Sequence, residues 1–170
     1  MTYSSALFRT GQESLEAAQT QKYASMVDQL GAKPGDHVLE IGCGWGGFAE
    51  YAAKERGLKV TGLTISQEQF AFAQERIARA GLQDQVTFKL QDYRDERGSY
   101  DAVASIEMFE AVGEQYWPTY FDTVRDRLNP GGRATLQVIT VEDHRFEAYR
   151  NTVDFIQKYI FPGGMLPSPS

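Results

Sequence analysis

The chain has 170 residues, 42% of them hydrophobic, and a formal net charge of −6 at pH 7. This length and apolar content suit one globular domain with its own core, and no segment approaches the roughly 18 consecutive apolar residues of a membrane-spanning helix. An acidic balance without a block of Lys and Arg argues against a nucleic-acid partner, because phosphate binding requires clustered positive charge.

The N-terminal sequence MTYSSALFRTG is too polar for a secretory signal. We therefore expect a cytoplasmic protein, with peripheral contact at the inner face of the membrane left open. Cys43 is the only cysteine, so an intrachain disulfide is impossible, and the two histidines, His37 and His144, are too few for a His/Cys metal cluster. The sequence predicts no metal site.

Helix-like and strand-like patterns alternate along the chain. The helical segments carry apolar residues at helical spacing and stop at Gly31, Gly57 and Gly81, whereas the strand-like segments are rich in β-branched and aromatic residues. In chain order we predict a helix over 14–30, a turn over 33–36, a strand over 37–42, a helix over 48–56, a strand over 59–64, a helix over 67–80, strands over 86–91 and 100–106, a helix over 115–128, a turn over 129–132, a strand over 133–140 and a helix beginning near 146. This alternation is typical of an α/β fold with a parallel sheet flanked by helices.

A glycine-rich turn follows the first predicted strand in VLEIGCGWGG, residues 38–47. Such a turn between a strand and a helix lets the backbone approach a ligand closely, because no Cβ atoms obstruct it. Its glycines satisfy both G-x-G-x-x-G and G-x-G-x-G. The glycines alone therefore do not distinguish a nicotinamide dinucleotide, a phosphate or S-adenosylmethionine.

The residues near the end of the second predicted strand argue against a dinucleotide. A dinucleotide fold places an acid there, about 20 residues after the glycines, to hold the ribose. The corresponding sequence GLTISQEQ offers Thr64 and Ser66, and its first acid, Glu68, should already lie in the next helix.

Two other acids favour S-adenosylmethionine. Glu40, two residues before Gly42, suits a ligand with a charged amino group, and Asp92 after the third strand can accept a hydrogen bond from an adenine amine. Each also has a structural alternative, which is support of the turn for Glu40 and capping of the next segment for Asp92.

The motifs LEIGCGWGG, GLTISQEQ, QDYRD, SIEMFEAVG and FIQKYIFPGGMLPS occur in this order along the chain. In these motifs the chain resembles the cyclopropane-fatty-acyl-phospholipid synthases, a family that is like the mycolic acid cyclopropane synthases. The resemblance implies a class I methyltransferase Rossmann-like fold and transfer of a methyl or methylene group from S-adenosylmethionine to a double bond in an unsaturated phospholipid acyl chain. The implied cofactor contacts are Tyr3, Ser4, Gly42, Gly44, Gly46, Thr64, Ile65, Gln69, Asp92 and Tyr93. We add Glu40 and Cys43 to the predicted cofactor site. Cys43 is expected there as a small packing residue of the turn rather than as a nucleophile.

The resemblance also implies a base for ring closure. In the family this base is thought to be a bound bicarbonate, which here would be held by Glu110 and by the backbone at Ile106. The chain departs from the family pattern at two further ligands, because Ser5 stands where a cysteine is usual and Gln137 stands where a histidine is usual. These departures leave open whether bicarbonate takes part. They also leave open whether the product is a cyclopropane, a methyl or a methylene group.

Two other functions remain open from the sequence: a C- or O-methyltransferase of another small apolar molecule, and a cofactor-binding remnant without catalysis. The aromatic residues are divided between core and substrate positions. Those on the predicted helical faces are expected in the core, and those after the fourth strand are expected either in the core or at the substrate. The first group is Trp45, Tyr51, Phe70 and Phe72, and the second is Phe109, Tyr116 and Trp117.

We predict one methyltransferase domain over residues 1–170, with a helical part over 1–34, a cofactor-binding core over 35–142 and a substrate-side segment over 143–170. In the family, two further strands follow the fifth one. We therefore expect this chain to lack the last two strands, to bind cofactor and to methylate poorly alone. A homo-oligomer is also expected to be possible, through apolar side chains left uncovered near the C-terminal end of the sequence: Phe155, Ile156, Tyr159, Ile160 and Phe161.

Overall fold

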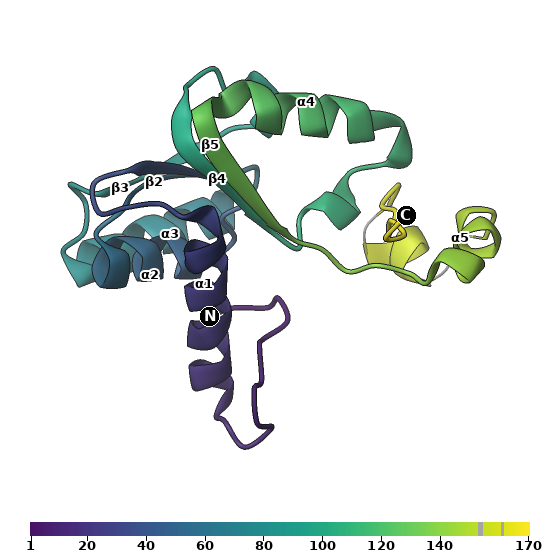
Figure 1. Ribbon diagram of the computed structural model, residues 1–170, viewed down its shortest axis with the longest axis horizontal. Coiled ribbons are helices and arrows are strands. Elements are labelled where there is room, and N and C mark those ends of the chain that lie inside the picture. The colour runs from purple at the N-terminus through teal and green to yellow at the C-terminus, as the bar shows by residue number, and fades with distance from the viewer. Residues whose placement is uncertain (153–154, 161) are drawn as a thin grey trace.

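The fold is built on a five-stranded sheet in the order β3-β2-β1-β4-β5, in which every neighbouring pair is parallel (Figure 1). The computed structural model describes residues 1–152, 155–160 and 162–170. The strands are β1 His37–Ile41, β2 Lys59–Thr64, β3 Val86–Leu90, β4 Tyr100–Ile106 and β5 Leu128–Gln137. All five predicted strands are present, and the predicted parallel α/β architecture is confirmed.

Helices cover both faces of the sheet. The helices are α1 Leu15–Leu30, α2 Gly47–Arg56, α3 Gln67–Ala80, α4 Trp117–Arg127 and α5 Asp143–Arg150. Side chains alternate along β1, so Val38 packs with α1, α2 and α3 on one face and Leu39 packs with Tyr120 of α4 on the other. Strands buried on both faces explain the continuous apolar runs in the sequence.

The sequence signals for the helix ends are confirmed. Gly31, Gly57 and Gly81 each adopt the left-handed conformation just after α1, α2 and α3. At the other ends, Ser14 accepts a hydrogen bond from the Ala17 amide and Ser66 accepts one from the Gln69 amide. These caps satisfy amides that have no partner within the helix.

The fifth strand differs from its prediction at both ends. It begins at Leu128, which pairs with Tyr100, because the predicted turn over 129–132 is a bulge inside the ladder. After this bulge the pairing resumes between Arg133 and Ala102. It ends at Gln137, and two residues farther on the Ile139 amide donates to the Glu110 carboxylate instead of to a strand.

The helix predicted over 115–128 is shorter than expected. A 3₁₀ turn over Glu114–Tyr116 precedes α4, and Pro118 then lies in the first helical turn. Proline is tolerated in that turn because its missing amide hydrogen would have no partner there. The backbone beyond Arg127 enters β5 at once.

The C-terminal segment lies beside α5 (Figure 1), and the Val141 amide, which follows β5, donates to the Pro167 carbonyl in this segment. Its helix begins at Asp143, three residues before the predicted start, and a single π-helical turn follows over Ile156–Ile160. Phe155, Tyr159 and Ile160 are 66%, 61% and 51% exposed, as expected of an uncovered apolar surface. The side chains of Ile156 and Phe161, named with them, lie outside the described residues, and self-association through this surface stays a prediction.

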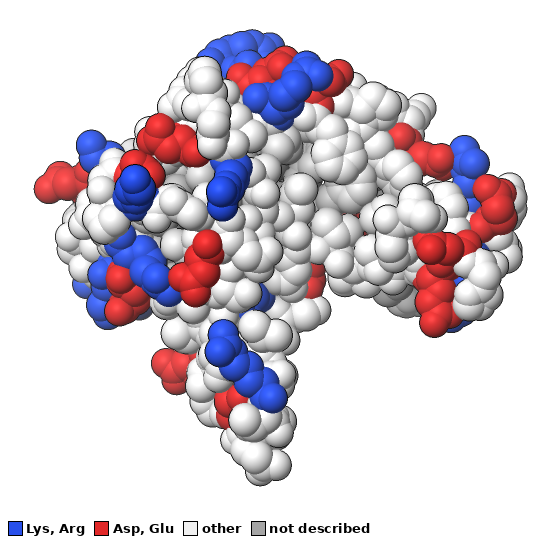
Figure 2. All heavy atoms as spheres, viewed as in Figure 1, with Lys and Arg blue, Asp and Glu red and all other residues white. Residues whose placement is uncertain are grey.

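Charges of both signs are distributed over the surface. On the face drawn in Figure 2, Lys and Arg are interspersed with Asp and Glu rather than gathered into one basic patch. None of the helices in the described part of the chain combines the length and the apolar character needed to span a bilayer.

Candidate active site

The candidate site lies at the carboxyl ends of β1 and β4. The strand order reverses between these two strands, and ligands of open α/β sheets bind at such a point. The glycine turn follows β1, with Gly42 and Gly44 at φ values of 80° and 51° that favour glycine. The amides of Gly42 and Cys43 both donate to the Leu63 carbonyl, which fixes the turn against β2.

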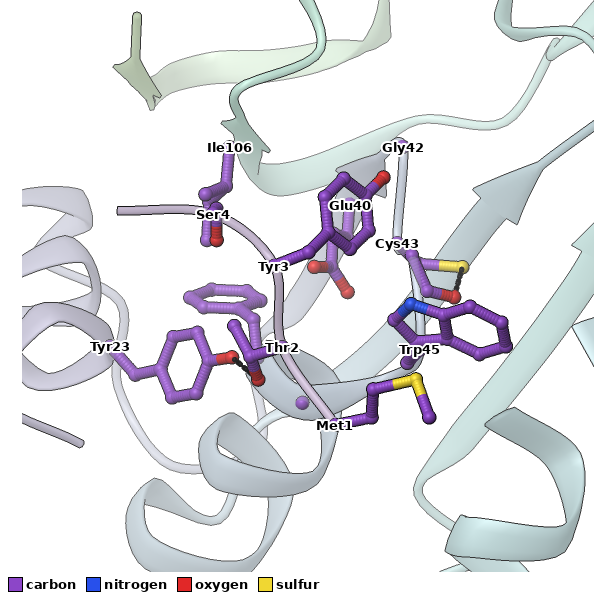
Figure 3. A pocket seen from close by; sticks show the side chains of 13 residues that line it. Met1, Thr2, Tyr3, Ser4, Tyr23, Glu40, Gly42, Cys43, Trp45 and Ile106 are labelled. Atoms are coloured by element: carbon purple, nitrogen blue, oxygen red, sulfur yellow. Dashed lines mark hydrogen bonds between the residues drawn. The ribbon is translucent and has the colours of Figure 1, made fainter. Parts of the chain in front are cut away.

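A first cavity lies between the glycine turn and the N-terminal segment. In Figure 3 the segment that carries Tyr3 and Ser4 runs alongside β1 and the turn, which carry Glu40, Gly42 and Cys43. The Glu40 side chain is 2% exposed, and its Oε2 atom has no hydrogen-bond partner in the described part of the chain. Burial raises the pKa of Glu40 well above its ordinary value, and the charge of Lys22 opposes this shift. A buried carboxylate oxygen without a partner is a ready acceptor for a donor of a ligand.

The N-terminal segment is held over this cavity by α1. The Lys22 ammonium donates to the Ser4 hydroxyl at 2.6 Å, and the Gln19 amide donates to the Ser4 carbonyl at 2.7 Å. The hydroxyls of Thr2 and Tyr23 are 2.9 Å apart. Burial lowers the pKa of Lys22 to about 8, against the attraction of Glu107 and Glu40. Tyr3 and Ser4 are therefore brought to the predicted cofactor site by specific contacts.

A second, larger cavity of about 580 Å³ continues from the glycine turn toward the end of β4. This volume lies within the range of small-molecule sites. At one end Thr64 donates to the Gln69 side-chain oxygen at 2.9 Å, and the Gln69 amide group lies 3.4 Å from the Tyr3 hydroxyl. The cavity is lined by these predicted site residues: Tyr3, Gly42, Gly44, Thr64, Ile65, Gln69, Asp92, Tyr93, Ile106 and Glu110.

Asp92 has the structural role that the sequence left open. Its carboxylate caps the 3₁₀ turn over Tyr93–Asp95 by accepting from the Arg94 amide, and it also pairs with the Arg94 guanidinium at 2.7 Å. The hydrogen bonds from Arg94 hold the pKa of Asp92 below its ordinary value. Asp92 still lines the cavity as an ionised acceptor. Glu68 lies in the first turn of α3 and accepts from Ser66, so no acid stands at the end of β2.

Glu110 lies half-buried at the far end of the larger cavity. Its Oε1 atom accepts a hydrogen bond from the Ile139 amide, and its Oε2 atom is buried without a partner in the described residues. Burial raises the pKa of Glu110, and the negative charge of Glu107 adds to this shift. The Met165 amide donates to the Glu110 carbonyl at 2.9 Å, so the C-terminal segment is anchored beside this carboxyl.

Ser5 and Gln137 converge on a residue that the sequence did not single out. The Ser5 amide and the Gln137 side-chain amide each donate to Oε1 of Glu107 at 2.8 Å. Glu107 has a φ of 48° and is the one non-glycine residue of the described chain in the left-handed region. Its position directly after the fourth strand was the available signal, because that strand ends at the ligand edge of the sheet.

Some predicted site residues lie away from the two cavities. Gly46 lines neither of them: a Cβ there would lie 3.1 Å from Ala73 and Phe88, so this glycine serves the packing of α2. Ser5 and Gln137 line a separate cavity of about 260 Å³ beside α1. The backbone that meets Glu110 is that of Ile139, whereas Ile106 lines both main cavities.

The aromatic residues divide as the packing requires. Phe109 is 4% exposed and packs with Trp117 and Tyr120, so both Phe109 and Trp117 belong to the core layer under α4. Tyr116 lines the larger cavity and is 45% exposed. The group expected in the core is partly buried: Tyr51 and Phe70 pack against the core under α2 and α3, and Trp45 packs edge-on against Phe72.

Cys43 is buried in the turn, where burial raises the pKa of its thiol. A thiol that stays protonated is a poor nucleophile, so the expected packing role is retained.

We expect Glu40→Gln to weaken binding of S-adenosylhomocysteine about tenfold, since a hydrogen bond from a charged donor contributes about 1.5–3 kcal/mol. Because burial raises the Glu40 pKa, the folded state keeps its proton while the unfolded chain ionises above about pH 4.5. The wild type should therefore lose stability relative to the variant as pH rises from that value, and the two should match below it. Calorimetry and urea unfolding at three pH values measure both effects. The exposed Glu55→Gln is the control; a pH-independent difference in stability would contradict the buried, protonated carboxyl.

The sequence profile of the family described as mycolic acid cyclopropane synthetase matches residues 1–170. Tuberculostearic acid methyltransferase UfaA1 of Mycobacterium tuberculosis is 46% identical over 175 residues, which cover 99% of this chain and 41% of that protein. Cyclopropane-fatty-acyl-phospholipid synthase of Escherichia coli is 44% identical over 168 residues, which cover 99% of this chain and 42% of that protein. The chain thus spans about two fifths of the length of these curated relatives.

A solved structure supports the same grouping. The mycolic acid cyclopropane synthase CmaA1, complexed with SAH and CTAB, superposes with a TM-score of 0.87 at 29% identity. The match covers 98% of this chain and 62% of that one.

Proposed function

Because the chain belongs to the mycolic acid cyclopropane synthetase family, we propose that the protein is an S-adenosylmethionine-dependent methyltransferase acting on the double bond of an unsaturated lipid acyl chain. The observation that carries the cofactor assignment is Glu40, a buried carboxyl group with an unpartnered oxygen at the glycine turn. In this proposal residues 35–142 hold the cofactor, and residues 143–170 lie toward the substrate.

The residues around the turn fit this cofactor. Glu40 suits its amino group, Thr64 and Gln69 offer polar atoms beside the turn, and Asp92 offers an ionised acceptor farther along the same cavity. S-adenosylmethionine, when bound, supplies a methyl group carried on a positively charged sulfur. The absence of an acid at the end of β2 argues against a nicotinamide dinucleotide, which needs that acid for its ribose.

The far end of the larger cavity fits an apolar substrate with a reacting centre that becomes positively charged. Met108 and Val112 line the cavity with hydrocarbon, and Tyr116 adds an aromatic ring. The carboxyl groups of Glu107 and Glu110 lie at the same end. An alkene that attacks a methyl group leaves positive charge on carbon, and carboxylates and ring faces stabilise such charge where water is excluded.

The lipid class is the finer part of the proposal. The printed names of the relatives cover a phospholipid synthase and a tuberculostearic acid methyltransferase, both of which concern fatty acyl chains. We favour a phospholipid acyl chain, reached by peripheral contact at the inner face of the membrane. Bicarbonate is a further candidate component from the sequence resemblance, and its fit depends on the groups around Glu107.

The test is methyl transfer from labelled S-adenosylmethionine to vesicles of unsaturated phospholipid, with saturated phospholipid as control, using the full-length product of the gene. We expect label in the unsaturated lipid alone. The mass of the lipid should rise by one CH₂ for a ring or methylene product, and by one CH₂ and two hydrogens for a saturated methyl product. NMR separates these products. Label only in another small acceptor would indicate the C- or O-methyltransferase alternative. Cofactor binding without any transfer would indicate the non-catalytic alternative, and tighter binding of NAD than of S-adenosylhomocysteine would overturn the cofactor assignment.

A further inference from the structure

Glu107 is the least expected residue of the candidate site. It stands directly after β4 with a φ of 48°, a conformation that L-residues other than Gly, Asn and Asp seldom adopt. Its amide donates to the Gln137 carbonyl at 2.8 Å, which holds the backbone of Glu107 against the end of β5. Unfavourable backbone conformations of this kind persist where the surroundings fix them, and they gather at functional sites.

The Glu107 side chain is held by two donors from distant parts of the chain. The Ser5 amide and the Gln137 side-chain amide both donate to Oε1 at 2.8 Å. Since both hydrogen bonds from the described residues end on Oε1, the second oxygen, Oε2, is the one available to accept a proton. Glu107 also lines the larger cavity together with Met108 and Glu110.

These contacts do not fit a free bicarbonate at the same place. The Ser5 backbone amide and the Gln137 side-chain amide already donate to the Glu107 carboxylate. A further anion would add negative charge beside Glu107 and Glu110, where burial raises the pKa of Glu110 and the charge of Glu107 adds to that rise. Lys22 faces Glu107 from α1, but its ammonium donates to Ser4. Gln137 is a neutral amide at any ordinary pH, and it can donate to a carboxylate without itself exchanging a proton.

We propose that the Glu107 carboxylate is the general base of the reaction, in place of bicarbonate. This inference rests on the proposed function. The π electrons of the substrate double bond form the new bond to the methyl carbon while the carbon–sulfur bond breaks and its electron pair stays on sulfur. The neighbouring substrate carbon becomes cationic. Glu107 then takes one proton from the added methyl group. The released C–H electron pair closes the cyclopropane ring onto the cationic carbon. Alternatively, a 1,2-hydride shift first moves the positive charge to the carbon that carries the methyl group, and the released pair then forms the double bond of a methylene group. Both outcomes release one proton in total, which Glu107 returns to solvent.

The first test compares the wild type with Glu107→Gln, which keeps the shape of the side chain and removes its charge. We expect turnover to fall at least about 100-fold, as is usual for loss of a general base, while affinity for S-adenosylhomocysteine changes less than about threefold. Calorimetric binding and a melting curve show whether the variant is folded. The exposed Glu142→Gln is the matched control and should leave turnover unchanged. Turnover of Glu107→Gln within threefold of wild type would overturn the proposal.

The second test asks whether bicarbonate is used. Wild-type turnover should be unchanged in buffer freed of carbon dioxide, whereas a fall that added bicarbonate restores would overturn the proposal. Glu107→Gly vacates the carboxylate position with a residue that suits φ 48°. Its turnover should rise at least about tenfold with added bicarbonate and then saturate. The carbon-13 resonance of labelled bicarbonate should broaden with this variant and stay sharp with the wild type.

Wild-type turnover distinguishes failure of the proposed methyl transfer from failure of the proposed role of Glu107. If the wild type transfers no methyl group to unsaturated lipid under any buffer condition, the proposed function fails and the assignment of Glu107 falls with it. If the wild type transfers methyl groups but depends on bicarbonate, the proposed function stands and only the assignment of Glu107 fails.

Discussion

Glu110→Gln is expected to lower turnover by about 100-fold or more while leaving the affinity for S-adenosylhomocysteine within about threefold of wild type. The reason is that the carboxyl lines the larger cavity but not the cavity at Glu40, with Oε1 fixed by the Ile139 amide and Oε2 facing no protein donor among the described residues. Charge placed there acts on the reacting centre and not on the bound cofactor. Single-turnover methyl transfer and calorimetry, on the same preparations, measure the two quantities separately.

Glu114→Gln provides the matched control for Glu110. It lies four residues along the same segment, but its carboxylate pairs with Arg150 at 2.7 Å and does not line the larger cavity. We expect normal turnover for this variant. Equal losses of turnover and of cofactor affinity in Glu110→Gln would show that Glu110 supports the fold of the site rather than the reaction.

Gly44→Val should abolish cofactor binding, with affinity for S-adenosylhomocysteine reduced by about 100-fold or more. Gly44 lines both cavities, and a Cβ there would lie 3.5 Å from the Tyr3 ring, which is ordinary contact. The rest of a valine side chain would therefore occupy the space that the cofactor needs. Calorimetric titration of wild type and variant, at protein concentrations that allow weak binding to be measured, gives the ratio.

A valine at a second glycine, Gly131, is the control that separates the effect of backbone strain from obstruction of the cofactor site. Gly131 has a φ of 83°, and a Cβ there would meet no atom within 4 Å, since it lies in the exposed bulge of β5. Gly131→Val carries the same unfavourable φ without touching either cavity. Both variants should melt at lower temperature than wild type, yet Gly131→Val should bind normally. Normal binding by Gly44→Val would place the cofactor elsewhere on the molecule.

The sequence alone determined the elements that depend on neighbours along the chain. Apolar spacing and terminal glycines located α1, α2 and α3, because a helix end is decided by the few residues around it. β-branched runs located all five strands. The sequence around residues 38–47 likewise located the glycine turn between a strand and a helix. The residues after β2 showed that no acid stands at the end of that strand. The parallel arrangement of the sheet and its ligand edge then followed from general rules for α/β folds, whereas the strand order came from the structure.

Only the tertiary structure decided which groups meet at that edge. Ser5 lies 102 positions from Glu107, and Gln137 lies 30 positions from it, yet both donate to one carboxylate oxygen. The φ of Glu107 is likewise fixed by β5 rather than by its neighbours in sequence, so no local pattern predicts it. The same holds for the end of β5, where Ile139 leaves the ladder to meet Glu110. Local spacing reports which face of an element is apolar, whereas hydrogen bonds between segments far apart in sequence depend on how strands, helices and termini pack together.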